Sequence, residues 1–257
     1  MVSKTDSVKE YPYARGYKAI ADNERNVDRP YDTFARLLEK ITKESFVADI
    51  GVGSGWLTLG LAKHCAMFYG IDPSEGLLAE ALTDANNSGH NNTQLIKGVA
   101  ADLPFADGTM DLVISLLAPH DTKEAYRVLR PGGHYHIEKV GAGDKRELKS
   151  FFGEDDEGPR GYLCTLQPGD RLRTLEAELK EAGLVDVKGE EVYFDQYFSG
   201  IDEFVHLLKE VPHTIRNFSE YDDRKALEKI AATLMTDKGL RTTRHEIIIT
   251  GTKPAKP

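Results

Sequence analysis

Cysteine is scarce in this chain of 257 residues: Cys65 and Cys164 are the only two, and neither has a partner at CxxC spacing. A disulfide framework and a zinc site built on cysteine are therefore not expected, and no metal ligands are assigned. Long apolar runs are missing as well, since none approaches the roughly 20 residues that span a bilayer. We expect no membrane partner. Residues 1–18 contain no apolar signal-peptide core, so the sequence predicts a cytoplasmic protein.

Basic residues are outnumbered, with 33 Lys and Arg against 42 Asp and Glu and a formal net charge of −9. An acidic chain repels a phosphate backbone, which disfavours a nucleic-acid substrate without excluding one, because a local basic patch could still bind it. Repeats and low-complexity tracts are also missing, so one domain over residues 1–257 is expected. No pattern in the sequence indicates an oligomeric state.

Apolar runs of strand length alternate with segments of helical periodicity over the first 140 residues. This alternation predicts an α/β protein with a doubly wound, mostly parallel, seven-stranded sheet and helices on both faces. The expected strands, in chain order, are 46–50, 66–72, 93–98, 111–117, 134–140, 191–198 and 245–252. The expected helices are 31–42, 56–63, 73–87, 122–129, one around residues 172–179, and two within 200–239, a helical insertion before the last strand.

Residues 49–55 read Asp-Ile-Gly-Val-Gly-Ser-Gly and lie between the first expected strand and the helix that follows it. Gly51, Gly53 and Gly55 lack a Cβ atom, so the backbone can turn tightly and lie against a flat ligand. In an open parallel sheet, ligands bind at the carboxyl ends of the strands, where the following helix would direct its free N–H groups. The alternative is a glycine-rich turn that binds nothing.

The spacing of these glycines separates two classes of nucleotide site from a third. The dinucleotide fingerprint G-x-G-x-x-G fails, because Trp56 or Thr58 stands where the last glycine is needed, and no Gly-Lys-Ser/Thr follows as in a P-loop. The pattern D-x-G-x-G-x-G resembles the first motif of class I S-adenosylmethionine-dependent methyltransferases. The resemblance implies a Rossmann-like methyltransferase fold, S-adenosylmethionine as the cofactor, and contacts to it from Asp49 and the three glycines.

Asp72 ends the second expected strand, 17 residues after Gly55. A carboxylate there can accept two hydrogen bonds from ribose hydroxyls, which are strong because the acceptor is charged. The alternative is a capping residue for the helix that opens at Pro73. The resemblance assigns Asp72 to the cofactor ribose and places Pro73 beside it.

Two further segments extend the resemblance over roughly residues 46–140. Gly98-Val-Ala-Ala-Asp-Leu-Pro-Phe105 is similar to the family's segment after the third strand, although Val99 and Ala101 replace its two usual acids. Asp102 would then meet the adenine amino group, helped by backbone groups of Ala101 and Leu103. An ordinary loop with a capping aspartate is the alternative. The segment 127–133, Arg-Val-Leu-Arg-Pro-Gly-Gly, matches the family's turn before the fifth strand.

His120 is the candidate general base. It follows the fourth expected strand, where an acceptor would meet the cofactor, and an imidazole titrates near neutral pH. The alternative is a surface histidine that caps the next helix. Residues 1–28, with Tyr11, Tyr13 and Tyr17, are expected to form a lid over the cofactor, or else a loosely ordered tail.

The sequence therefore predicts a methyltransferase that transfers a methyl group to a small-molecule acceptor by in-line displacement. One alternative is an RNA base methyltransferase of the guanine type, which APHDTKEAYRVLRPGG and DEFVHLLKEVPHTIRNF distantly resemble. Those enzymes carry a cysteine-rich zinc module that this sequence lacks. The other alternative is a non-catalytic module that only binds S-adenosylmethionine.

Overall fold

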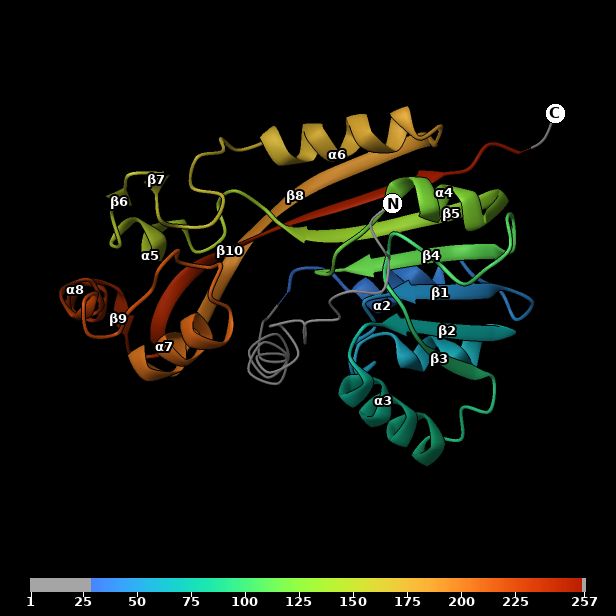
Figure 1. The fold of residues 1–257 in the computed structure, drawn as a ribbon, viewed down its shortest axis with the longest axis horizontal. Helices are drawn as coiled ribbons and strands as arrows, with labels where there is room; N and C mark the ends of the chain where they lie inside the picture. The colour runs from blue at the N-terminus through green and yellow to red at the C-terminus, as the bar shows by residue number, and fades with distance from the viewer. Residues whose placement is uncertain (1–28, 256–257) are drawn as a thin grey trace, which may run out of the picture.

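A computed structural model describes residues 29–255, in which one sheet has the strand order β3-β2-β1-β4-β5-β10-β8 (Figure 1). The expected doubly wound, mostly parallel sheet is confirmed, and beside the seven strands of this order a short eighth strand, β9 (Met235–Thr236), pairs with β10. The parallel strands are β1 (Phe46–Ile50), β2 (Met67–Asp72), β3 (Thr93–Lys97), β4 (Met110–Leu116) and β5 (Leu129–Val140). β10 (Gly239–Thr252) runs antiparallel to both β5 and β8 (Val185–Phe198).

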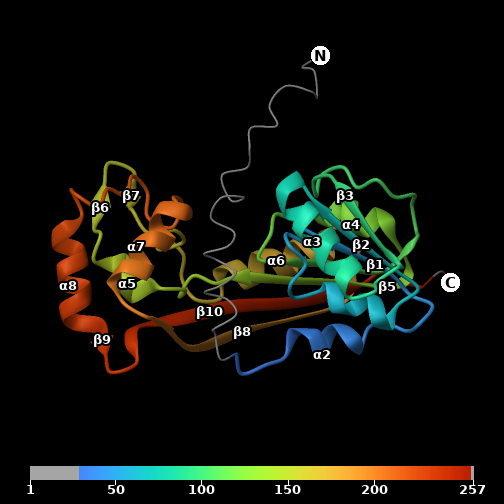
Figure 2. The same ribbon diagram turned by 90° about the horizontal axis from the view of Figure 1, so that it is seen from below.

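Helices cover both faces of this sheet. One face carries α2 (Thr33–Leu38), the 3-10 helix η1 (Leu59–His64) and α3 (Glu75–Asn87), and the other carries α4 (Thr122–Val128) and α6 (Asp170–Glu181). Buried side chains of each set pack against the strands in a separate hydrophobic cluster. In Figure 2, α2 and α6 lie on opposite sides of the long strands β8 and β10.

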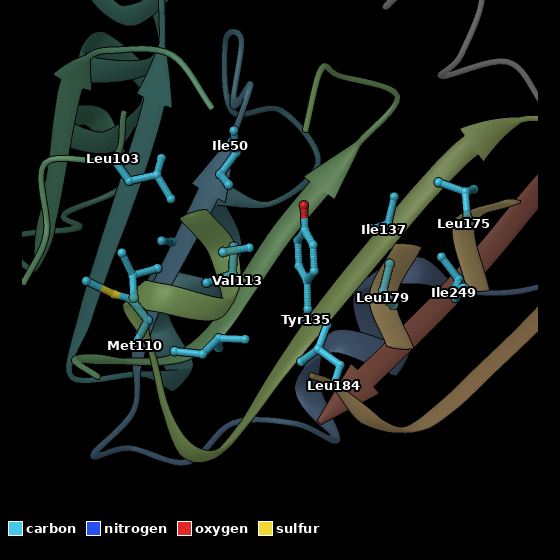
Figure 3. Close-up of a cluster of buried hydrophobic side chains, with 14 of the residues drawn as sticks. Ile50, Leu103, Met110, Val113, Tyr135, Ile137, Leu175, Leu179, Leu184 and Ile249 are labelled. Carbon is cyan, nitrogen blue, oxygen red and sulfur yellow. The ribbon is translucent and has the colours of Figure 1, made fainter. Parts of the chain in front are cut away.

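The hydrophobic cluster beneath α4 and α6 is built from apolar residues spaced at strand and helix periodicity. Figure 3 shows Tyr135 and Ile137 of β5 together with Leu175 and Leu179 of α6 and Ile249 of β10. Residues two apart in a strand share a face, and residues four apart in a helix do the same, so both periodicities direct apolar groups inward. Complete burial of such a side chain stabilises the fold by roughly 1.5–3 kcal/mol.

The helix expected directly after the glycine loop is largely missing. Only six residues of that segment are helical, as η1 (Leu59–His64), and residues 51–58 form turns. A short 3-10 helix has poorer hydrogen-bond geometry and a smaller aligned dipole than an α-helix. The glycine loop therefore presents its own turn to the sheet edge rather than the first turn of a long helix.

A second lobe lies beyond the carboxyl ends of the parallel strands (Figure 1). β8 and β10 run into it, and its own hydrophobic core includes Phe198 of β8, Phe204 of α7 and Leu240 of β10. Its remaining elements are α5 (Arg146–Ser150), β6 (Glu154–Asp155), β7 (Gly158–Pro159), α7 (Ile201–Glu210), α8 (Arg224–Leu234) and β9 (Met235–Thr236). The helical insertion expected at 200–239 forms α7 and α8, and residues 146–159 join it. Over residues 29–255, no helix combines the length and apolarity needed to cross a membrane.

Candidate functional site

A cleft of about 630 Å³ lies at the carboxyl ends of the parallel strands, against the second lobe. One half of its lining comes from the loop after β1, the end of β2 and the loop after β3. The other half comes from the loop between β4 and α4, the end of β5, and segments of the second lobe on either side of β8. This is the position in which open parallel sheets bind ligands.

The glycine loop borders the first half, which we call the loop half, and lines it through Gly51 and Val52, whereas Gly53 and Gly55 are not among the lining residues. Gly51, Gly53 and Gly55 all have positive φ angles, of 78°, 56° and 74°. A Cβ atom on Gly51 would stand 2.3 Å from the Cβ of Ala118, so that position admits only glycine. The glycines expected from the sequence thus lie in one turn, and the loop after β4 packs directly on Gly51.

The loop after β4 contains an unusual residue that the sequence pattern did not mark. Leu117 lines the cleft and has a φ of 52°, a left-handed backbone conformation that residues other than glycine rarely adopt. Its backbone N–H donates a hydrogen bond of 2.9 Å to the Glu138 carbonyl of β5. Strained residues of this kind concentrate at binding sites, and here the turn carries Ala118 back over Gly51.

Asp72 joins two loops of the cleft. Its Oδ2 accepts a hydrogen bond of 3.0 Å from the Gly53 N–H, and its Oδ1 accepts one of 2.8 Å from the Ser74 N–H. The side chain is 7% exposed, and burial raises its pKa against the lowering effect of these two bonds. Ser74, not Asp72, is the N-cap of α3, because its hydroxyl accepts from the Leu77 N–H. Pro73 also lines the cleft.

Asp49 has a buried oxygen atom with no protein partner. Its Oδ2 accepts a hydrogen bond from the Thr58 hydroxyl, whereas Oδ1 has no partner among the residues that the structure describes. The side chain is 3% exposed, and burial raises its pKa to about 7, although the Thr58 bond opposes this. Buried polar atoms are nearly always hydrogen-bonded, so an open acceptor beside the glycine cradle fits a ligand that supplies a donor.

The segment expected to contact adenine reaches the cleft through its first residues. Gly98, Val99 and Ala100 line the cleft, while Leu103 is 3% exposed and packs in the core below the sheet. Asp102 is exposed, and Ala101 lies in the same turn. Adenine contacts by residues 101–103 stay a prediction. Tyr17, with the rest of the expected lid over residues 1–28, lies outside the described part of the chain.

His120 lines the same cleft from the loop between β4 and α4. Its Nε2 lies 3.3 Å from a carboxylate oxygen of Glu178 on α6. Burial and the nearby Lys139 lower the pKa of His120, whereas Glu178 raises it. Together these effects lower the pKa from its usual value of 6.5. The imidazole is therefore neutral at pH 7. The N-cap of α4 is Asp121, whose carboxylate accepts from the Glu124 N–H, so His120 does not serve as that cap.

Cationic side chains dominate the other half of the cleft, which we call the acceptor half. No motif in the sequence marked them, because they come from β5, the second lobe, α6 and β10, and meet only in the folded chain. The five Lys and Arg residues of these elements that line this half are Lys139, Lys145, Lys149, Arg171 and Arg244.

Glu138 faces the same cleft, but protein groups already occupy its carboxylate. Its carboxylate accepts a hydrogen bond of 3.0 Å from the Thr33 hydroxyl and lies 3.0 Å from the Nε2 of the buried His136. These contacts tie the end of β5 to the start of α2 and explain the histidine at position 136. Glu138 and His136 thus support the wall of the cleft.

Comparison with known proteins matches this part of the chain to methyltransferases. A family described as a methyltransferase domain matches residues 48–137, the part that carries the glycine loop, Asp72 and His120. A malonyl-[acyl-carrier protein] O-methyltransferase of Marinomonas is 27% identical over 218 residues, covering 77% of this chain and 78% of that protein. The biotin biosynthesis bifunctional protein of Cellvibrio japonicus is 28% identical over 206 residues, or 76% of this chain.

The chain spans only 38% of the length of that bifunctional protein. Among solved structures, the YcgJ protein of Bacillus subtilis superposes with a TM-score of 0.58 at 18% identity, over 86% of this chain and 98% of that one. At this identity the likeness concerns the fold.

Proposed function

We propose that this chain is a class I methyltransferase that uses S-adenosylmethionine and methylates a small-molecule acceptor bound in the acceptor half of the cleft. The observation that carries the proposal is the continuity of the cleft. The same cavity that contains the glycine loop and Asp72 continues past His120 to the second lobe, so two ligands can lie end to end.

The residues of the loop half suit the expected cofactor. The open Asp49 acceptor can receive a hydrogen bond from its amino group, and Asp72 can receive bonds from its ribose hydroxyls on the lone pairs that Gly53 and Ser74 leave free. When bound, S-adenosylmethionine supplies a methyl group on a positively charged sulfur, which an acceptor atom takes by in-line displacement. Gly51, which has no Cβ atom, lets Ala118 pack on the loop and so sets the shape of this half.

His120 is the group of this chain best placed to receive a proton from the acceptor. It is neutral at pH 7, because burial and Lys139 lower its pKa, and Glu178 beside it would stabilise the imidazolium once it forms. Such a base is needed only where the acceptor atom carries a proton that must leave. The second lobe shields the acceptor half, which favours a small molecule over a long polymer.

The comparisons support an acceptor of this kind. The Marinomonas relative is named for a malonyl group on a carrier protein, and its similarity extends over most of both chains. No relative of this identity fixes the acceptor atom, so we restrict the proposal to a small-molecule group that enters the acceptor half.

The test uses the full chain with S-adenosylmethionine that carries an isotopic label in its methyl group. The protein is incubated separately with a small-metabolite extract and with total RNA, and a Gly51→Val variant serves as the inactive control. With the wild-type protein we expect label in the small-metabolite fraction and not in RNA. With the Gly51→Val variant we expect label in neither. Label in RNA alone would favour the base methyltransferase instead, and cofactor binding without transfer to either pool would favour the non-catalytic module.

A further inference from the structure

Among residues 29–255, two cations of the acceptor half have no anionic partner. Lys139 donates to the Ala118 carbonyl, and Arg171 donates to the Val140 carbonyl at 2.7 Å. Within residues 29–255 neither side chain has a carboxylate at ion-pairing distance. Glu178 is the acid that raises the pKa of Lys139. Its carboxylate, however, accepts a hydrogen bond from Thr122 and lies against His120. Both cationic side chains therefore face the cleft without a carboxylate partner among these residues.

Burial makes this arrangement costly. Lys139 is 5% exposed, and burial, assisted by the neighbouring Arg171, lowers its pKa to about 7. A buried charge without a partner is strongly unfavourable, and proteins normally pair it or neutralise it. A ligand anion between the two side chains would supply the missing partner and restore the charged ammonium.

The deeper part of the same half adds to the positive field. Lys145, Lys149 and Arg244 lie 3.3, 3.9 and 3.6 Å from the carboxylate of Asp144, so three cations share this acid. Burial alone would raise the pKa of Asp144, yet these cations hold it at about 2. Arg244 has a second acid, Glu246, at 2.8 Å. Positive potential thus extends from Lys139 into the second lobe.

The uncompensated pair also lies next to the cofactor site. The Ala118 carbonyl that receives the Lys139 ammonium belongs to the residue that packs on Gly51. On the other side, the Arg171 guanidinium lies 5.9 Å from the ring centroid of Tyr162, which closes the wall toward the second lobe.

We propose that Lys139 and Arg171 bind an oxyanion of the acceptor, a carboxylate or a phosphate, and hold the acceptor beside the glycine loop. The proposal rests on the function proposed above, since it names the substrate class of the same cleft. Charge-assisted hydrogen bonds to both cations orient the anion, and Arg171 can engage two of its oxygens at once. Both residues are binding residues in this assignment, and His120 remains the proton acceptor.

The experiment measures anion binding directly, without turnover. The full chain is saturated with S-adenosylhomocysteine and titrated by calorimetry with malonate, with inorganic phosphate and with the neutral malonamide. We expect one or both anions to bind and malonamide not to bind, and the stronger anion identifies the group. Lys139→Met and Arg171→Gln should each weaken anion binding roughly tenfold or more, because each removes a charged hydrogen bond.

Arg173→Gln is the matched control, since it lies on the same helix with its side chain 67% exposed and should leave anion binding unchanged. Lys139→Arg keeps the charge and should restore most of the affinity, which separates lost charge from disturbed folding. Equal binding of malonamide, no binding of either anion to the wild-type protein, or full anion affinity in both neutral variants would overturn the proposal. Failure of the wild-type protein to bind S-adenosylhomocysteine would instead reject the proposed function.

Discussion

The backbone N–H of Gly53 donates a hydrogen bond of 3.0 Å to the carboxylate of Asp72. The bond connects the loop after β1 with the end of β2, two segments that are neighbours in the sheet. It means that the acid expected to hold the ribose also fixes the loop expected to hold the rest of the cofactor. A change at position 72 therefore affects both.

We expect Asp72→Ala to weaken S-adenosylmethionine binding by more than tenfold. The substitution removes the charged acceptor for the ribose and the contact that orients the glycine loop. Calorimetric titration of the purified variant measures the change. Asp72→Asn is the informative companion, because its NH₂ group cannot accept from the backbone N–H that it meets. An unchanged dissociation constant in both variants would exclude Asp72 from the ribose site.

Gly51→Ala should abolish detectable cofactor binding while the protein remains folded. The added methyl group would meet Ala118 at 2.3 Å, so the loop or its neighbour must move. Gly89→Ala is a matched control, since Gly89 also has a positive φ, of 69°, but open space around its Cβ position. Both variants should lose roughly 1–2 kcal/mol of unfolding free energy from backbone strain. Equal cofactor affinity in the two variants would contradict this role of Gly51.

His120→Ala should lower turnover by about 10²–10⁴-fold, the usual contribution of a positioned base, with little change in cofactor affinity. The pH profile gives a second check. The base acts when deprotonated, and its pKa is lowered from 6.5, so the wild-type rate should rise with pH in the acid range and be level by pH 7. A variant with the wild-type rate and profile would show that another group, or none, takes the proton.

The stability of the cofactor-free protein should fall as the pH rises from about 4 to about 7 through the titration of Asp49. Its pKa is raised by burial from 3.8 to about 7, so in this range the folded state binds more protons than the unfolded state. Each tenfold difference in proton affinity between the folded and the unfolded state corresponds to about 1.4 kcal/mol at most. Urea unfolding of the wild-type protein and of Asp49→Asn isolates the effect, because the variant lacks this proton. Parallel stability curves would argue against the raised pKa.

Sequence patterns predicted the sheet well because its signals are local. The strands β1, β2 and β5 contain apolar runs that end at Gly51, Asp72 and Gly141, and the glycine loop begins at the first of these ends. The segment after the loop shows the limit of periodicity. Its apolar residues have helical spacing, but Gly55 has a φ of 74° and residues 51–58 form turns, so only η1 is left.

The cationic residues of the acceptor half show a different limit. Lys139 and Arg171 belong to β5 and α6, with α5 and two short strands between them in the chain. Neither belongs to a motif, and a lone lysine or arginine is most often a solvated surface residue. The chain leaves β5 for the second lobe and returns as α6, which packs on the sheet beside β5, and this return brings the two side chains to one cavity. Nothing in their spacing predicts it.

The long pair β8 and β10 links the two halves of the molecule without a break (Figure 1). Second-lobe stretches that flank this ribbon line the far end of the acceptor half, while Lys139, Arg171 and the loops of the loop half belong to the sheet and the helices that cover it. Exchange of the second-lobe stretches would therefore redirect the chemistry toward other acceptors and leave the nucleotide-binding machinery in place. The ribbon of β8 and β10 thus joins a constant part of the molecule to a part that can vary.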